Sequence, residues 1–458
     1  MSRHDIIILL ILILISTACK DRDWTNIYDP NLPPSLPDSL IGTVISFKQI
    51  DLHLNGTTPN VFSYHIDRLA SGEDTWIPIA QIDSSTNSFV DTTVLPTTTY
   101  IYRFYTKNKF GTSDTLYTDY LTTTEKRLMI LGLKESSTLL ALDYSTRNVV
   151  WELTINNLKE FIVDPTWKML IYSDGYNIVK LNPITGIKLD SIKSVIPVKD
   201  FEWSPNGEWI GFNRGVNFTS IGVLDAATFD VQFTFGINLP ILDYEISSNL
   251  QYVVVSTYSN IKVWSTTSNT ITNSFDISGG FGNKVAISPN SEKFAYTSQD
   301  FTQVRNTSDG TIIWGGSFRS NDIEFSHDSD FIYTMDNRTI VPKVSKYEFP
   351  YSQESIWSSS FEFVQLDLIM TPSFGMLISY GYFSGDNKLR ALSPGSGNTI
   401  WEIETRRQLN IVIDGDQEFV VANGYRFAGI YDLNTGEELS SNYYDQDIVD
   451  VRVSPVLD

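Results

Sequence analysis

The sequence predicts an all-β protein made of a small β-sandwich followed by a larger β-propeller. Aromatic residues make up 13% of the chain, Thr, Ser, Val and Ile are plentiful, and stretches typical of helices are few. From residue 127 onwards a unit of four short strands recurs about every 42 residues, which is the range of propeller blades. A chain of 458 residues also exceeds one ordinary core, so we expect at least two domains.

Residues 1–18 have the pattern of a secretory signal peptide. A run of Ile and Leu at residues 6–15 follows Arg3, and it leads into Ser16, Thr17, Ala18 and Cys19. This run covers only about half of a ~30 Å hydrocarbon layer, so it is too short for a membrane span. The ending Ser-Thr-Ala-Cys resembles the lipobox of bacterial lipoproteins, with Ser16 where that motif usually has Leu. The resemblance implies that Cys19 is lipidated and becomes the new N-terminus; an ordinary signal peptide is the alternative.

Residues 19–38 are expected to form the lipidated cysteine and a tether. Residues 20–23 are all charged, and Pro30, Pro33, Pro34 and Pro37 favour an extended chain without regular structure. Charged residues directly after a lipidated cysteine resemble the surface-export signal of Bacteroidota lipoproteins. We therefore expect a lipid-anchored protein of the cell envelope, at the outer membrane, facing either the periplasm or the surface.

The charge balance excludes two kinds of partner. Lys and Arg number 33 against 54 Asp and Glu, which gives a net charge of −21. Nucleic-acid binding needs a basic footprint, and attraction to anionic lipid headgroups needs basic clusters, so neither is expected. Membrane attachment is left to the N-terminal lipid.

Residues 39–124 are predicted to form the β-sandwich. Residues 44–47, 61–66, 76–80 and 100–104 alternate apolar and polar side chains, and Gly, Asn, Asp and Ser clusters separate them. The segment from Pro96 to Tyr100 resembles the Pro-x-Thr-x-Tyr corner of fibronectin type III domains, whose tyrosine hydroxyl bonds back to the backbone. Phe47 stands where that family usually has a core tryptophan. The resemblance implies a spacer that holds a larger domain away from the membrane.

Residues 127–458 are predicted to form the propeller. The turns after the first strand of several units are alike, and they lie at residues 204–207, 288–291, 326–329 and 371–374. These units resemble WD repeats, in which a tryptophan such as Trp264 closes the third strand. They also resemble quinoprotein-dehydrogenase-like propellers, whose motif is matched by Ala141, Asp143, Thr146 and Trp151, with Arg147 in the glycine position, and more loosely by Gly310 with Trp314 and Ala391, Gly397 and Trp401. In that family the tryptophan packs between blades.

The number of units predicts eight blades, with seven as the alternative. The units begin near residues 127, 158, 198, 242, 283, 321, 364 and 410. The first unit lacks its opening strand, and the chain ends with a spare one at residues 448–453. We expect this spare strand to complete the first blade and close the ring, which leaves no ragged edge.

A search for chemistry finds no catalytic motif and no metal-ligand spacing. His327 is the one histidine of the repeat region, and it lies in a turn that reads Ser-Pro-Asn in two other units. The cysteine pair of the quinone alcohol dehydrogenases cannot exist here, because Cys19 is the single cysteine. The sequence therefore predicts no catalytic residue, no cofactor and no metal.

One face of the predicted propeller gathers aromatic and arginine side chains. The loops that join second to third strands, and fourth strands to the next blade, lie on the same face. Tyr and Arg are enriched at interface hot spots, aromatic rings stack on sugars, and Arg binds carboxylates in a bidentate way. The opposite face has mainly short polar turns, with Phe349 and Tyr351 as an exception. The candidate ligand-binding residues are Tyr176, Arg214, Phe218, Arg338, Tyr382, Arg406, Arg407, Tyr425, Arg426, Tyr443 and Tyr444, joined on this Tyr/Arg face by Tyr258, Phe281, Phe301 and Phe383.

We expect an envelope lipoprotein that displays a binding or scaffold propeller for a protein or an acidic glycan. One alternative is a propeller polysaccharide lyase or hydrolase that uses carboxylates with Tyr or Arg. Another is a structural component of an envelope assembly. A deep central pocket lined by carboxylates of raised pKa would favour the enzyme, and a broad aromatic face would favour binding.

Overall fold

The computed structural model describes residues 34–56, 61, 63–215, 217–277, 284–298, 300–318, 320–336, 341–361, 364–371, 377–383, 386–405, 410–413, 418–424 and 426–457. Every regular element assigned within these ranges is a β-strand, which confirms the predicted all-β class. Within the same ranges, no helix has the length and apolar character to cross a membrane. The leader, Cys19 and most of the tether lie outside the described residues. The chain divides into two compact units, Met1–Lys126 and Arg127–Asp458.

The first unit is a sandwich of two antiparallel sheets. One sheet has the order β1-β2-β5, and in the other β3 lies between β4 and β6, while β7, β8 and β9 all pair with β6. Inward-facing Leu52 of the first sheet and Tyr102 and Phe104 of the second are buried in a shared core. The strands are β1 (Ser39–Ser46), β2 (Gln49–Asn55), β3 (Ser63–Ala70), β4 (Ile77–Asp83), β5 (Ser88–Asp91), β6 (Thr99–Asn108), β7 (Gly111–Thr112), β8 (Leu116–Tyr117) and β9 (Leu121–Thr122).

Two polar contacts fix the corner that leads into β6. The backbone N–H of Leu95 donates to the hydroxyl oxygen of Tyr100 at 2.8 Å, as expected of the Pro-x-Thr-x-Tyr segment. The buried carboxylate of Asp91 accepts hydrogen bonds from Arg68 at 2.7 Å and from the Tyr102 hydroxyl at 2.9 Å. Burial acts to raise the pKa of Asp91, but hydrogen bonds from Thr93, Arg68 and Tyr102 outweigh it and hold that pKa below its usual value.

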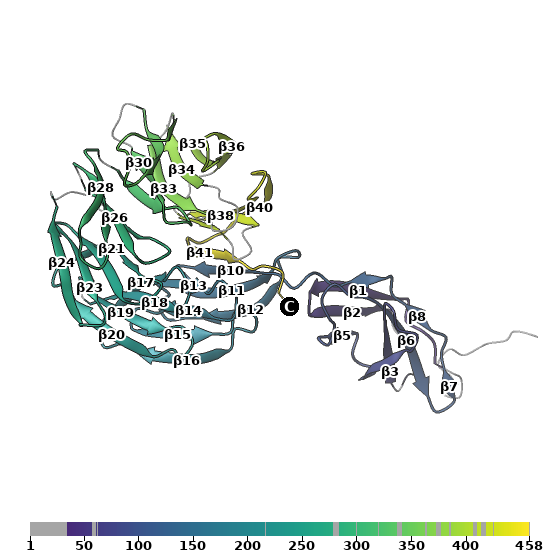
Figure 1. Ribbon diagram of the computed structural model, residues 1–458. Helices are drawn as coiled ribbons and strands as arrows, with labels where there is room; N and C mark the ends of the chain where they lie inside the picture. Colours follow the sequence, from purple (N-terminus) through teal and green to yellow (C-terminus); the bar gives the residue numbers. More distant parts are fainter. Residues whose placement is uncertain are drawn as a thin grey trace, which may run out of the picture. The chain divides into compact units, whose positions relative to one another are not determined.

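The second unit holds eight four-stranded antiparallel sheets among the described residues, arranged in a ring (Figure 1). In seven sheets the strands run in chain order from the channel outwards. The innermost strands are β13 (Glu160–Val163), β17 (Val198–Trp203), β21 (Ile241–Ile246), β25 (Val285–Ile287), β29 (Asp322–Phe325), β33 (Val364–Met370), β37 (Asn410–Ile413) and, from the C-terminus, β41 (Ile448–Val453). The next strands are β14 (Leu170–Ser173), β18 (Trp209–Arg214), β22 (Tyr252–Thr257), β26 (Lys293–Thr297), β30 (Phe331–Asp336), β34 (Leu377–Phe383), β38 (Phe419–Gly424) and β10 (Leu128–Leu133).

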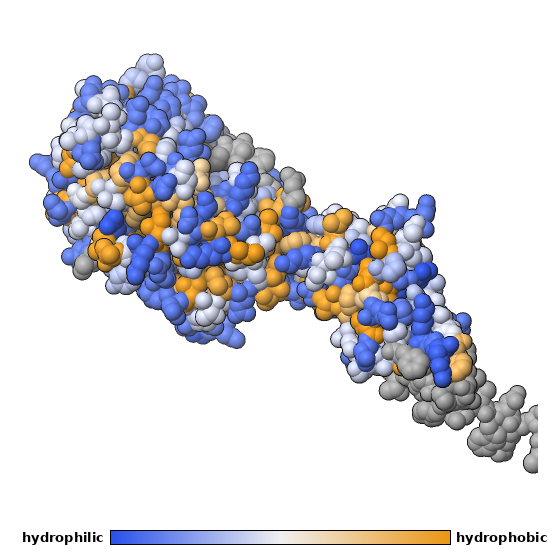
Figure 2. Space-filling model, turned by 90° about the horizontal axis from the view of Figure 1, so that it is seen from below, coloured by the Kyte–Doolittle hydropathy of each residue, from blue (hydrophilic) through white to orange (hydrophobic). Residues whose placement is uncertain are grey.

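The third strands are β15 (Asn177–Leu181), β19 (Ser220–Asp225), β23 (Asn260–Ser265), β27 (Thr302–Asn306), β31 (Lys343–Glu348), β35 (Asp386–Leu392), β39 (Phe427–Asp432) and β11 (Thr138–Asp143). The outermost strands are β16 (Lys188–Lys193), β20 (Val231–Gly236), β24 (Thr270–Asp276), β28 (Ile312–Gly316), β32 (Trp357–Ser360), β36 (Thr399–Thr405), β40 (Glu438–Tyr443) and β12 (Val149–Thr154). Burial decreases outwards: β22 is almost wholly buried, whereas β16 is almost wholly exposed. Apolar residues such as Leu189 and Val231 are exposed on these outer strands, and Figure 2 shows apolar and polar residues interspersed over one face.

The first and last segments of the unit meet in one sheet. β41 pairs with β10 in antiparallel register, so that Val451 lies opposite Leu131. The two side chains share a buried cluster with Phe419, Val421 and Ile430 of the neighbouring sheet. The C-terminal strand therefore supplies the innermost strand that the first unit of the repeat lacks.

Tryptophan side chains hold consecutive sheets together at four places. Trp151 Nε1 donates to the carbonyl oxygen of Pro183 in the next sheet at 2.9 Å, and Trp314, Trp357 and Trp401 donate in the same way to Ser352, Pro394 and Leu433. Three of these rings lie on a glycine of the receiving turn, namely Gly186, Gly397 and Gly436. All three glycines have φ near +70°, which glycine adopts without strain. The four contacts form what we call the tryptophan staples.

The Trp357 staple can be tested with a matched pair of glycine substitutions. Gly397 and Gly207 both have φ +71°, but an added Cβ would overlap the Trp357 ring at Gly397 and would meet nothing within 4 Å at Gly207. We expect Gly207→Ala to lower the free energy of unfolding by about 1 kcal/mol, from backbone strain alone, and Gly397→Ala to lower it by about 3 kcal/mol. Urea unfolding followed by tryptophan fluorescence measures both. Equal losses would show that the ring contact contributes nothing.

Candidate functional site

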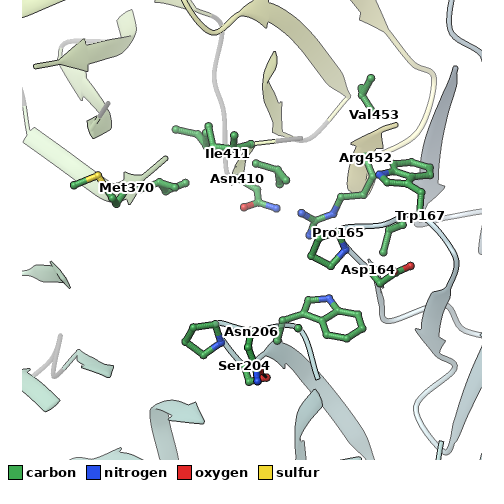
Figure 3. A pocket seen from close by; sticks show the side chains of 17 residues that line it. Asp164, Pro165, Trp167, Ser204, Asn206, Met370, Asn410, Ile411, Arg452 and Val453 are labelled. Atoms are coloured by element: carbon green, nitrogen blue, oxygen red, sulfur yellow. Dashed lines mark hydrogen bonds between the residues drawn. The ribbon is translucent and has the colours of Figure 1, made fainter. Parts of the chain in front are cut away.

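A pocket of about 710 Å³ opens at one mouth of the central channel (Figure 3). It lies where the innermost strands turn into the second strands, which is the face opposite to the Tyr/Arg face. Five sheets contribute to it, those whose innermost strands are β13, β17, β33, β37 and β41. Its lining consists of Val163, Asp164, Pro165, Trp167, Trp203, Ser204, Pro205, Asn206, Gly207, Ile369, Met370, Asn410, Ile411, Val412, Ile413, Arg452 and Val453.

The rim of the pocket is built from turns that repeat around the ring. In the turn after β17, the N–H of Ser204 donates to the carbonyl oxygen of Trp209, and the N–H of Gly207 donates to that of Ser204. The same two bonds recur at Asp164, Ser247, Ser288 and Ser326. Only Gly207 of these five turns has glycine at the left-handed position, which Trp167, Leu250, Ser291 and Ser329 fill elsewhere. This hydrogen bonding holds the turns of β13 and β17 in place at the pocket rim.

Alternate residues of the innermost strands form two layers in the channel. Four residues before the turn lie Glu160, Asp200, Asp243, Lys284, Asp322, Asn410 and Asp450 in seven of the sheets, and we call these the deep layer. Two residues before each turn lie Ile162, Glu202, Glu245, Ala286, Glu324, Ile369, Val412 and Arg452, which we call the mouth layer. The mouth layer has carboxylates on one side and Ile369, Val412 and Arg452 on the other, and these last three line the pocket.

Most deep-layer carboxylates tie one sheet to its neighbour. Glu160 accepts the backbone N–H groups of Asp200 and Phe201, and Asp243 accepts that of Val285 at 2.9 Å. Asp322 accepts the N–H of Leu368 at 2.9 Å. Asp450 accepts hydrogen bonds from the side-chain amides of Asn410 and Asn423, which joins the last sheet of the ring to the first. These carboxylates therefore serve as hydrogen-bond acceptors that join neighbouring sheets.

Burial in the channel raises the pKa of several acids. Desolvation, followed by the charge of Asp200, raises the pKa of Glu160 to about 7. Desolvation, followed by the charge of Asp243, raises the pKa of Glu202 to about 8, and desolvation, followed by the charge of Glu202, raises the pKa of Glu245 well above its ordinary value. Desolvation also raises the pKa of Asp243, although Lys284 opposes the shift.

The structure describes six of the candidate residues of the Tyr/Arg face in full, and it divides them into two groups. Tyr176, Arg214 and Phe218 lie in the loops of the β13 and β17 sheets, and Arg426, Tyr443 and Tyr444 lie around the β37 sheet and its exit to β41. Tyr176 and Tyr443 are 52% and 61% exposed. Arg338, Arg406, Arg407, Tyr425 and Phe281 lie outside the described residues, as do the side chains of Tyr382 and Phe383.

Several described members of the Tyr/Arg face are engaged within the fold. Lys199 lies 4.0 Å from the centre of the Phe218 ring, and the Tyr443 ring packs on Phe427. Arg426 Nε lies 3.5 Å from the Asp447 carboxylate. Tyr444 packs against the cluster of the closing sheet, and burial raises its pKa. Ligand binding by this face stays a prediction.

Sequence reasoning missed Arg452 and Trp203, the two pocket residues with unused hydrogen-bond donors. It treated Arg452 only as part of the closing strand, and it did not single out Trp203. The available signal was alignment on the turns, which places Arg452 in the same layer as Glu202, Glu245 and Glu324. Arg452 is the one cation of the mouth layer, whose other members are acids and apolar residues, and this difference marks its position as unusual.

The raised pKa values predict a fall in stability between about pH 5 and about pH 8. Unfolded glutamates titrate near pH 4.3, so in this window the native state binds more protons and the free energy of unfolding decreases as pH rises. We expect a loss on the order of 1–3 kcal/mol from about pH 5.5 to about pH 8.5, and a flatter profile for Glu202→Gln. Urea titrations at several pH values measure the slope, with the exposed Glu437→Gln as control. A Glu202→Gln slope equal to that of wild type would contradict the assignment.

Comparisons with known proteins identify the fold of the second unit. No family model matches the chain, and no curated protein sequence matches it. Among solved structures, the dihydro-heme d1 dehydrogenase NirN in complex with DHE has a TM-score of 0.53 and 9% identity, covering 70% of this chain and 74% of that one. The C-terminal WD40 domain of Sif2 has a TM-score of 0.51 and 13% identity over 66% and 87%. A eukaryotic initiation factor has a TM-score of 0.50 and 10% identity over 72% and 98%. At these identities the likeness shows the fold alone, which is an all-β architecture with a β-propeller.

Proposed function

We propose that this protein is a binding module of the cell envelope, in which an eight-bladed propeller takes its ligand at the channel mouth. The observation that carries the proposal is the pocket of about 710 Å³, a size typical of ligand sites. Its walls come from strands and short hydrogen-bonded turns of five sheets, so the site is preformed. Preformed concave sites with apolar walls and few polar groups are characteristic of ligand binding.

The arrangement of acids supports binding rather than catalysis. Asp164 is the one carboxylate among the lining residues, and its oxygens accept hydrogen bonds from Thr166 and from the N–H of Met169. The acids with raised pKa, among them Glu202 and Glu245 of the mouth layer, are not among the residues that line the pocket. A general acid or base must reach the substrate, so the pocket offers no obvious candidate.

The first unit supports a spacer role in this proposal. Its two-sheet core and the Leu95–Tyr100 hydrogen bond fit a fibronectin type III sandwich. The interior of this small sandwich is filled by its own apolar side chains. Because it lies between the tether and the propeller in the sequence, it would hold the propeller away from the membrane. The lipid anchor on Cys19 completes the proposal.

The anchor predicts a specific covalent change. We expect wild-type protein produced in a bacterium with lipoprotein processing to begin at Cys19 and to carry acyl chains, and Cys19→Ser to lack them. Intact-mass spectrometry and detergent partitioning measure the difference. An unmodified Cys19 in the membrane-free fraction would contradict the anchor and leave the pocket proposal untouched.

The binding site predicts a selective loss when the pocket is filled. We expect Val412→Trp, which adds bulk to the lining, to weaken ligand binding about tenfold or more with little change in the unfolding midpoint. Binding is measured with the full-length chain on arrays of glycans, peptides and small organic acids and amines. Val231→Trp, at an exposed site on β20, is the matched control. Loss of binding on changing Tyr176 and Tyr443 to Ala, but not in Val412→Trp, would move the site to the Tyr/Arg face.

One observation favours a second candidate function, a polysaccharide hydrolase or lyase. Burial raises the pKa of Glu202 to about 8 and raises the pKa of Glu245, and a general acid needs a pKa raised in this way to keep its proton near neutral pH. Release of new sugar ends from acidic polysaccharides, abolished in Glu245→Gln, would establish this activity. Binding without turnover would exclude it for the polysaccharides tested.

A further inference from the structure

The pocket wall contains hydrogen-bond donors that the protein does not use. Among the described residues with a buried, unpartnered side-chain nitrogen or oxygen, Trp203 and Arg452 are the ones that line the pocket. The atoms are Trp203 Nε1 and Arg452 Nε. A buried donor without an acceptor costs on the order of 1–3 kcal/mol, so two at one site need an explanation.

Arg452 is held in place from one side. Its Nη2 lies 2.6 Å from the carboxylate of Asp450, which is itself 7% exposed and fixed by Asn410 and Asn423. Figure 3 shows the Arg452 side chain extending from β41 towards Asn410 and Pro165. The ion pair orients the guanidinium, whose buried Nε has no acceptor within the described protein.

The other polar groups of the lining are already engaged. Asp164 accepts bonds within its own turn. The Asn206 side chain bonds to Ser204, Glu208 and the carbonyl oxygen of Ser248. The described lining therefore has spare donors, and its acceptors are largely satisfied. A complementary ligand brings an acceptor.

The remaining wall is apolar. One side of the pocket is formed by apolar residues of β33, β37 and β41, namely Ile369, Met370, Val412, Ile413 and Val453. A sugar would present many hydroxyl groups to this wall, and the wall could not pair them. An alkyl or aryl body matches it.

The charges around the pocket favour a ligand whose anionic group carries a single negative charge. Arg452 is the only cation among the lining residues, and Asp450 already offsets part of its charge. The chain carries a net charge of −21, and Glu202 and Glu324 lie in the same layer as Arg452. A doubly charged phosphate would be repelled, whereas a carboxylate can bind a guanidinium with charge-assisted hydrogen bonds.

We propose that the pocket binds a carboxylate attached to an apolar body, with the carboxylate on Arg452 and Trp203 and the body on Ile369, Met370 and Val412. The same chemistry is offered by a free alkyl or aryl acid and by the C-terminus of a peptide that ends in an apolar residue. This inference rests on the proposed function, because it names the ligand of the same pocket.

Calorimetry on the full-length chain tests the inference with four probes. They are 4-phenylbutyrate, its uncharged amide, and the peptide Ala-Ala-Leu-Phe with a free or an amidated C-terminus. We expect at least one free carboxylate to bind about tenfold or more tightly than its amide. Arg452→Gln and Trp203→Phe should each reduce this preference, and Lys188→Gln on the exposed outer strand β16 should not. Trp203→Phe keeps an aromatic ring in the wall, so it tests the N–H even if Arg452→Gln disturbs Asp450.

The outcomes separate the inference from the proposed function. Binding of the peptide acid alone, or of phenylbutyrate alone, supports the inference and identifies the source of the carboxylate. Equal affinity for acids and amides, unchanged in both variants, overturns the inference. If Val412→Trp still abolishes binding in that case, the pocket remains the ligand site. If none of the array members or probes responds to Val412→Trp, the proposed function fails as well.

Discussion

Each four-stranded sheet of the propeller has two apolar faces, and neither can be buried by the sheet itself. β22 shows the constraint most clearly, because Val253, Val254 and Val255 are all fully buried although consecutive residues point to opposite faces. Both faces must therefore be covered by neighbouring sheets, and the array is satisfied only as a closed ring. Closure explains why the C-terminal strand returns to β10, and why the contacts between sheets are so regular.

Two kinds of contact maintain the spacing between sheets at different radii. Near the channel, carboxylates such as Glu160 and Asp243 accept backbone N–H groups of the next innermost strand. On the outermost strands, the tryptophan staples donate to carbonyl oxygens of the next sheet. Where both kinds of contact occur, they fix a sheet near the channel and again on its outer side. The channel carboxylates are thus primarily structural, and the pocket residues Arg452 and Trp203 stand out because they serve no such contact.

The local repeat could be predicted from sequence far better than the site. The Ser-Pro-Asn turns, the tryptophans at 151, 314 and 401 and the strand at 448–453 each have a local signature, and the innermost strands begin within two residues of the expected starts. The pocket has no such signature, because its lining comes from five sheets that are distant in sequence. Ile369 and Val412 look like ordinary core residues, and sorting loops by exposure directs attention to Tyr176 and Tyr443 on the other face. Trp357, the fourth staple, was also missed because it opens its strand instead of standing third in it.

The pairing of β10 with β41, which closes the ring, also determines how the propeller bears mechanical load. The chain passes from the first unit into the propeller at Arg127, and β10 begins at the next residue, Leu128. β10 pairs with β11 on one side and with β41 on the other. A pull along the axis of β10 must therefore shear two hydrogen-bonded ladders together, whereas an edge strand such as β12 has one ladder and can peel from its end. A protein tethered through its N-terminal unit, with a ligand held in the propeller, receives tension at a strand with partners on both sides.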